Sequence, residues 1–145
     1  MLIIFDCDGV LVDSEILAAR ELQHYLEDIA FPVIITEDTH TQFLGLTLKR
    51  IQEILETAAG CPLPNDFQTE LRRRDKIAFK RDLRAIPGIH QTLPLINYPK
   101  CVASSGTQEK VRDSLSITGL LEFFMPHVFS ASDPEVKHGK PAPDL

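Results

Sequence analysis

The sequence predicts an α/β protein whose parallel sheet is interrupted by an all-helical insert. Residues 2–5 form a short apolar run that ends in acidic residues and a glycine, which is typical of a strand turning at the edge of an open sheet. Residues 15 to about 84 then show helical periodicity, whereas strand-like runs return near residues 100–104 and 127–130. A block of helices that separates one strand from the others indicates an inserted domain.

The first strand leads directly into two carboxylates. Its uninterrupted apolar character predicts burial on both faces. Asp6 and Asp8 follow it, separated by one residue, and Gly9 lets the chain turn. Because two carboxylates this close tend to share a proton or a cation, we expect a nucleophile or metal ligand beside an acid/base group. An ordinary acidic turn has the same residues, so the motif needs support from its context.

The insert is expected to hold four helices, over residues 15–29, 36–43, 48–58 and 65–81. Asp13 or Ser14 is a candidate N-cap for the first helix, and Thr47 caps the third. Gly60 and Pro62 end the third helix.

The second half of the chain contains two further motifs. The strand near residue 100 ends in Ser104-Ser105-Gly106 before a helix over residues 107–117, and hydroxyl and N–H groups at a helix start can bind phosphate. An ordinary helix cap has a similar sequence. Lys140 precedes Pro-Ala-Pro, and its ammonium suits phosphate oxygens or a carboxylate, although a solvated Pro-rich loop is the alternative.

Composition limits the partners that the protein can have. The net charge of −6 argues against nucleic acid or an anionic membrane, so a phosphorylated substrate would need a local cationic site. No apolar run is long enough to cross a membrane, and because the strand starts at residue 2 we expect no signal peptide. Cys7, Cys61 and Cys101 show no Cys-x-x-Cys spacing, and we expect free thiols in a reducing cytoplasm.

Taken in order, the three motifs resemble those of the haloacid dehalogenase (HAD) superfamily, in its phosphatase and β-phosphoglucomutase-like branch. The resemblance implies a Rossmann-like parallel sheet core, residues 1–14 and 87–145, and a helical cap domain, residues 15–86. Aspartate at position 8 fits phosphatases and phosphomutases rather than the dehalogenases of the superfamily.

The resemblance also implies a role for each motif residue. Asp6 would be the nucleophile that forms an aspartyl-phosphate, and Asp8 would be the acid/base. Mg²⁺ would bind the Asp6 carboxylate and the Asp8 backbone carbonyl. The phosphoryl group would be held by Lys140, the Ser104 hydroxyl, the Ser105 N–H and Gly9, while Lys49 in the cap is a candidate for a second anionic group of the substrate or a solvated helix face.

The function expected from this resemblance is a magnesium-dependent phosphatase acting on a small phosphorylated metabolite. A β-phosphoglucomutase-like phosphomutase and a truncated, non-catalytic HAD-like domain are the alternatives. The family has a fourth motif, an acidic pair after a further strand, which the sequence up to Leu145 lacks. We therefore expect an incomplete core, weak Mg²⁺ binding, slow catalysis and an exposed apolar edge at residues 2–5 through which chains could self-associate.

Overall fold

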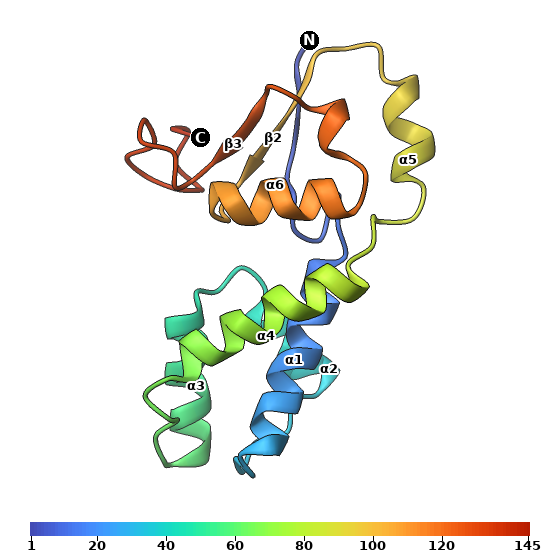
Figure 1. The fold of residues 1–145 in the computed structure, drawn as a ribbon. Coiled ribbons are helices and arrows are strands. Elements are labelled where there is room, and N and C mark those ends of the chain that lie inside the picture. Colours follow the sequence, from blue (N-terminus) through green and yellow to red (C-terminus); the bar gives the residue numbers. More distant parts are fainter. The chain divides into compact units, whose positions relative to one another are not determined.

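The computed structural model describes the backbone of residues 1–145 and all side chains except those of Glu37, Asp38 and His40. The chain divides into two compact units (Figure 1). The α/β unit comprises Met1–Ser14 and Asp82–Leu145, and the helical unit comprises Glu15–Arg81. None of the helices among the described residues is long and apolar enough to cross a membrane.

A parallel sheet forms the centre of the α/β unit, which confirms the predicted fold class. Its strands are β1 (Ile3–Phe5), β2 (Lys100–Ser104) and β3 (Val128–Ser130), in the spatial order β1-β2-β3. Helical segments connect them: α5 (Ile89–Thr92), η1 (Leu93–Leu95), α6 (Gln108–Ile117) and η2 (Leu121–Phe123). Figure 1 shows α6 lying across the strands.

The two faces of this sheet differ in burial. The strand register places Phe5, Val102 and Val128 on one face, where Val102 and Val128 are buried and the Phe5 ring packs edge-on against Phe124. The other face carries Ile4 and Phe129, which are 61% and 44% exposed. The expected burial of the first strand on both faces is therefore wrong for the described residues. An apolar run does not reveal whether its strand lies at the edge of a sheet or what covers each face. Self-association through this edge stays a prediction.

Four helices make up most of the helical unit, close to the expected ranges. They are α1 (Ser14–Asp28), α2 (Glu37–Phe43), α3 (Leu48–Ala59) and α4 (Phe67–Asp82). Thr47 caps α3 by accepting a hydrogen bond from the Arg50 N–H, and Gly60 ends α3 in a left-handed conformation at φ 68°. Apolar side chains from all four helices and the connecting loops form one core: Leu22, Tyr25, Leu26, Phe43, Ile51, Leu55, Leu63, Phe67 and Leu71.

The chain crosses between the units at two points that are tied together inside the α/β unit. Val12 pairs with Ala85 in an antiparallel bridge, and the Asp13 N–H donates to the Arg84 carbonyl at 2.9 Å. The Ile86 N–H donates in turn to the Leu11 carbonyl at 2.9 Å. These bonds tie residues 84–86 to the α/β unit, which begins again at Asp82, whereas the predicted insert extends to residue 86.

Candidate active site

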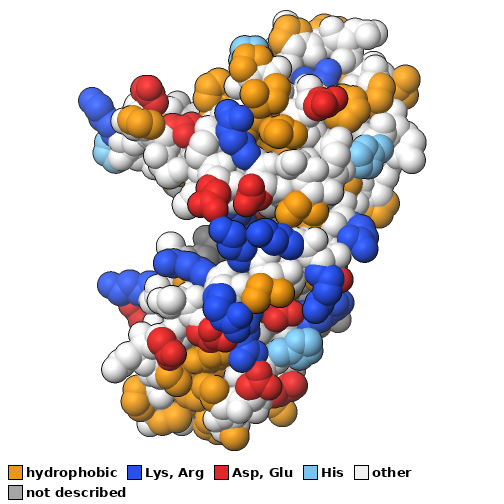
Figure 2. Space-filling view, viewed as in Figure 1, with side chains coloured by type: hydrophobic (Ala, Val, Ile, Leu, Met, Phe, Trp, Pro, Cys, Tyr) orange, Lys and Arg blue, Asp and Glu red, His pale blue; other side chains and the backbone are white. Residues whose placement is uncertain are grey.

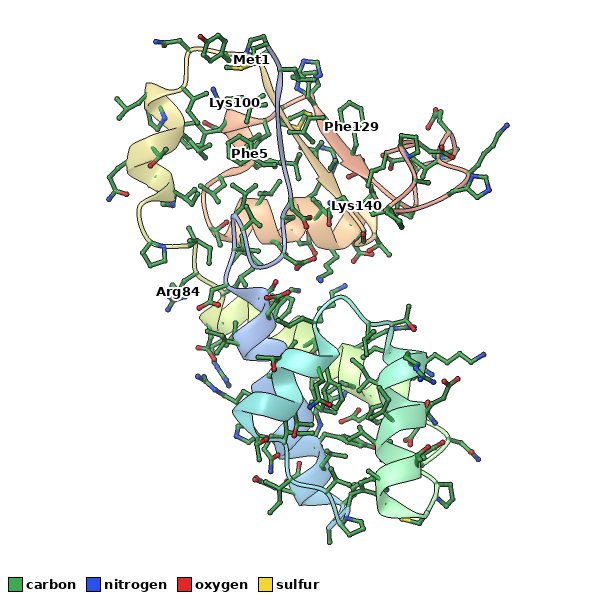
Figure 3. All side chains as sticks on the ribbon, turned by 180° about the vertical axis from the view of Figure 1, so that it is seen from behind. Met1, Phe5, Arg84, Lys100, Phe129 and Lys140 are labelled. Atoms are coloured by element: carbon green, nitrogen blue, oxygen red, sulfur yellow. The ribbon has the colours of Figure 1, made fainter. Side chains whose placement is uncertain are left out.

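Polar side chains gather at one edge of the sheet because parallel strands bring their carboxyl ends together. Asp6 follows β1 directly, Ser104 is the last residue of β2, and the loop after β3 leads to Lys140. Figure 3 shows Lys140 at the end of the sheet where β2 leads into α6. The structure therefore brings together the three motifs that the sequence analysis singled out.

Asp6 is paired with Lys140 through one of its two carboxylate oxygens. The Lys140 Nζ lies 3.0 Å from Asp6 Oδ1, and the Cys7 N–H donates to the same oxygen at 2.8 Å. Lys140 Nζ also donates to the Ala103 carbonyl at 2.8 Å, which fixes the ammonium against the end of β2. Among the described residues, no donor forms a hydrogen bond with Asp6 Oδ2, and the side chain is 46% exposed. This oxygen is thus available to a cation or a phosphoryl group.

Asp8 has a separate set of partners. The Ser14 hydroxyl donates to Asp8 Oδ1 at 2.6 Å, so Ser14, one of two candidate helix caps, serves the carboxylate loop instead. The Lys110 Nζ donates to Oδ1 at 2.9 Å and to Oδ2 at 3.1 Å. Gly9, at φ 72°, turns the chain after Asp8, and its N–H donates to the Val12 carbonyl at 2.9 Å.

Sequence reasoning missed Lys110. One physical signal could have pointed to it: Lys110 lies in the first turn of α6, where the helix dipole disfavours a cation. A nearby anion can offset this cost. Only the tertiary structure identifies that anion as Asp8, which is 102 residues away in the sequence.

The Ser104-Ser105-Gly106 loop is held in place by neighbouring strand ends. Ser104 is buried, and its Oγ accepts a hydrogen bond from the Gly106 N–H at 3.1 Å. Ser130 Oγ donates to the Gly106 carbonyl at 2.6 Å, and the Ala131 N–H donates to the Ser104 carbonyl at 2.9 Å. Ser105 is exposed at the turn. The loop thus reaches the N-terminus of α6 in a fixed conformation, as a phosphate-binding segment requires.

Cys7 lies between the two acidic residues but is unsuited to act as a nucleophile. Burial, together with the charge of the nearby Asp8 carboxylate, raises the pKa of the Cys7 thiol to about 12. Burial also raises the pKa of Cys101, whereas Cys61 is exposed. All three cysteines are free thiols.

This difference predicts that one thiol per chain, that of Cys61, reacts rapidly with an aromatic disulfide reagent in the native protein. At about pH 8, close to the ordinary thiol pKa, Cys7 and Cys101 should react only after denaturation. The release of the coloured thiolate measures the reaction, and Cys61→Ser should abolish the rapid phase. Two rapid thiols in the native protein would contradict the burial of Cys7.

Oxygen atoms that could hold Mg²⁺ are Asp6 Oδ2 and the Asp8 backbone carbonyl, to which no backbone N–H among the described residues donates. Lys110 and Ser14 already engage the Asp8 carboxylate. No group of three His, Cys, Asp or Glu side chains among the described residues could enclose a metal ion. Two protein oxygens are compatible with Mg²⁺, because this ion keeps several waters and binds substrate phosphates.

Some of the basic residues of the helical unit form ion pairs with acidic residues of the same unit. Figure 2 shows Lys and Arg side chains gathered over α4. Arg73 and Arg74 both donate to Glu70, and these hydrogen bonds lower the pKa of Glu70 to about 2. Arg74 also pairs with Asp28 at 2.6 Å. Lys49 is exposed in the first turn of α3, and its role in substrate binding stays a prediction.

The family model described as haloacid dehalogenase-like hydrolase matches residues 3–145. The chain belongs to this family. Two solved structures share the fold of this HAD chain. A conserved HAD-like protein of unknown function from Agrobacterium tumefaciens has a TM-score of 0.89 at 35% identity, covering 99% of this chain and 64% of that one. A provisionally named β-phosphoglucomutase from Thermotoga maritima has a TM-score of 0.76 at 26% identity, covering 99% of this chain and 66% of that one.

Two curated relatives of the HAD chain are phosphatases. The 6-phosphogluconate phosphatase of Escherichia coli is 31% identical over 144 residues, which are 99% of this chain and 64% of the relative. The phosphorylated carbohydrates phosphatase of Thermotoga maritima is 28% identical over 150 residues, which are 99% of this chain and 66% of the relative. The HAD chain therefore spans 64% of the length of the first relative and 66% of the length of the second.

Proposed function

We propose that this HAD chain supplies the nucleophile and the acid/base of a phosphatase that hydrolyses phosphorylated carbohydrates. The observation that carries the proposal is the pair of carboxylates at the carboxyl end of β1, each with its own lysine. Asp6 has Lys140 at 3.0 Å, and Asp8 has Lys110 at 2.9 Å. Two neighbouring carboxylates in different surroundings can take different roles in one reaction. The activities named for the two curated relatives support the choice of substrate class.

In the first proposed step, the Asp6 carboxylate attacks phosphorus and an aspartyl-phosphate forms. The bond from phosphorus to the sugar oxygen breaks, its electron pair stays on that oxygen, and protonated Asp8 gives it a proton. Lys140 contributes positive charge beside the phosphoryl oxygens, where negative charge spreads in the transition state. N–H groups at the start of α6, with the Ser104 hydroxyl, hold the other phosphoryl oxygens.

In the second proposed step, a water molecule attacks phosphorus of the aspartyl-phosphate. The Asp8 carboxylate accepts a proton from that water, and the bond between phosphorus and Asp6 breaks. Inorganic phosphate leaves, while Asp6 is restored as a carboxylate and Asp8 is again protonated. The exposed Asp6 side chain leaves the reacting centre accessible to water in the α/β unit.

Mg²⁺ is the cofactor that we propose, held by Asp6 Oδ2 and the Asp8 carbonyl. Bound there, the ion would neutralise negative charge on the carboxylate and on the phosphoryl oxygens. The helical unit would act as the cap that selects the sugar, with Lys49 as a candidate contact. Because Cys7, Cys61 and Cys101 are free thiols, we propose the cytoplasm as the location.

The proposal is tested by measuring phosphate release from a panel of phosphorylated carbohydrates that includes 6-phosphogluconate. We expect release with Mg²⁺, loss of release with EDTA, and recovery when Mg²⁺ is added back. The expectation of slow turnover stays a prediction that the same assay measures. A folded protein that releases no phosphate from any member of the panel would contradict the phosphatase proposal and favour a binding role.

A phosphomutase is the second candidate, favoured by the likeness to the provisionally named β-phosphoglucomutase. The two candidates differ in where the phosphoryl group goes. With glucose 1-phosphate as substrate, phosphorus NMR should show inorganic phosphate for a phosphatase. Accumulation of glucose 6-phosphate without inorganic phosphate would instead establish the mutase.

A further inference from the structure

We propose that Lys110 is a positioning residue for Asp8, holding the acid/base carboxylate in the place from which it protonates the leaving oxygen. The inference rests on the proposed phosphatase function and adds a residue that lies outside all three sequence motifs. Lys110 would act through Asp8 and would not need to touch the substrate.

The geometry around Asp8 carries this inference. Lys110 Nζ contacts both carboxylate oxygens, at 2.9 and 3.1 Å, while Ser14 Oγ contacts only Oδ1, at 2.6 Å. Contact with both oxygens restrains rotation of the carboxylate, which a single hydrogen bond leaves free. The two donors come from different segments, the start of α1 and the first turn of α6. Asp8 is therefore held between two elements rather than by its own loop alone.

Neighbouring residues of α6 and its preceding loop set the position of the Lys110 side chain. Thr107 caps α6 and accepts a hydrogen bond from the Lys110 N–H at 3.3 Å, which sets the direction of the first turn. A Cβ atom at Gly106 would lie 3.4 Å from the Lys110 Cδ and 3.4 Å from Ser104 Oγ. The stem of Lys110 thus packs closely over Gly106. The helix dipole disfavours a lysine in the first turn, and the contact with the Asp8 carboxylate offsets this electrostatic cost.

Each of the two lysines contacts a different carboxylate. Lys140 contacts Asp6 and the Ala103 carbonyl, whereas Lys110 contacts Asp8. The Lys110 and Asp8 side chains are 42% and 27% exposed. A partly exposed pair contributes little to folding stability, so removing the Lys110 ammonium should change activity more than the melting temperature.

The test compares kcat/KM of the full chain and Lys110→Met on two substrates that differ in their leaving group. A sugar phosphate needs a proton on its leaving oxygen, whereas p-nitrophenyl phosphate has a stable leaving anion. We expect Lys110→Met to lower kcat/KM for the sugar phosphate about 10- to 100-fold, because misplacing an acid/base group costs about this much. The loss for p-nitrophenyl phosphate should stay below about threefold, because its departure needs little acid catalysis.

Three further variants separate positioning from other roles. In an Asp8→Asn background, Lys110→Met should change kcat/KM for p-nitrophenyl phosphate less than about twofold, because a residue that acts through Asp8 has nothing left to position. Lys110→Arg should recover most of the sugar phosphate activity, since a guanidinium also contacts two carboxylate oxygens. Arg112→Met is the matched control: it removes a cation from the same helix, and Arg112 contacts Met125 Sδ at 3.3 Å.

Equal losses on both substrates, or an additive loss in the Asp8→Asn background, would overturn the positioning role and indicate direct phosphate binding or a structural effect. An unchanged kcat/KM in Lys110→Met would overturn it as well. If the unaltered protein hydrolyses neither substrate, the proposed function fails first and this inference falls with it. Because Lys110 is partly exposed, we expect Lys110→Met to fold, and Lys110→Gln provides a second, polar replacement.

Discussion

Asp6→Asn should reduce phosphate release from phosphorylated carbohydrates at least about 1,000-fold, or to the level of the assay blank. The amide has nearly the shape of the carboxylate but lacks the negative charge that attacks phosphorus in the proposed mechanism. It also removes the ion pair with Lys140, whose Nζ lies 3.0 Å from Asp6 Oδ1. Because Asp6 is 46% exposed, the substitution should leave the folded structure in place.

The measurement is the initial rate of phosphate release, with circular dichroism to confirm folding. Asp113→Asn serves as the matched control, because Asp113 is an exposed aspartate on α6 that lies outside the three motifs. It should retain nearly full activity. A folded Asp6→Asn protein with a rate within about tenfold of the unaltered protein would remove Asp6 from the proposed mechanism.

Phe67→Ala should lower the free energy of unfolding by about 3–5 kcal/mol, because it leaves a large cavity in the core of the helical unit. Phe67 is fully buried, and its ring centroid lies 5.4 Å from that of Tyr25. The substitution removes this aromatic pair together with the contacts of the ring to the surrounding apolar core.

Urea unfolding followed by far-ultraviolet circular dichroism measures this loss. Ile77→Ala on the same helix is the matched control, since Ile77 is 51% exposed and its truncation should cost less than about 1 kcal/mol. Equal losses for the two variants would show that Phe67 is not a core residue of the unit.

Local patterns predicted much of the fold. Helical periodicity and capping residues located α1 to α4 to within a few residues, because the first turn of a helix depends on side chains such as Thr47 that are close in the sequence. The three motifs were predicted to meet for a general reason, since neighbouring parallel strands share one edge for their carboxyl ends. Asp6 and Lys140 indeed form a pair in the structure. Their catalytic roles stay predictions.

Other features depended on contacts between distant residues, which no local pattern contains. The apolar run of residues 2–5 looked fully buried, yet Ile4 is 61% exposed, because burial depends on which element covers each face of a sheet. Ser14, a candidate helix cap, instead donates to Asp8. Lys110 meets Asp8 across 102 residues of sequence because α6 starts where β1 ends. Local motifs were therefore enough to predict candidate reacting groups, but only tertiary packing decided which side chain contacts each of them.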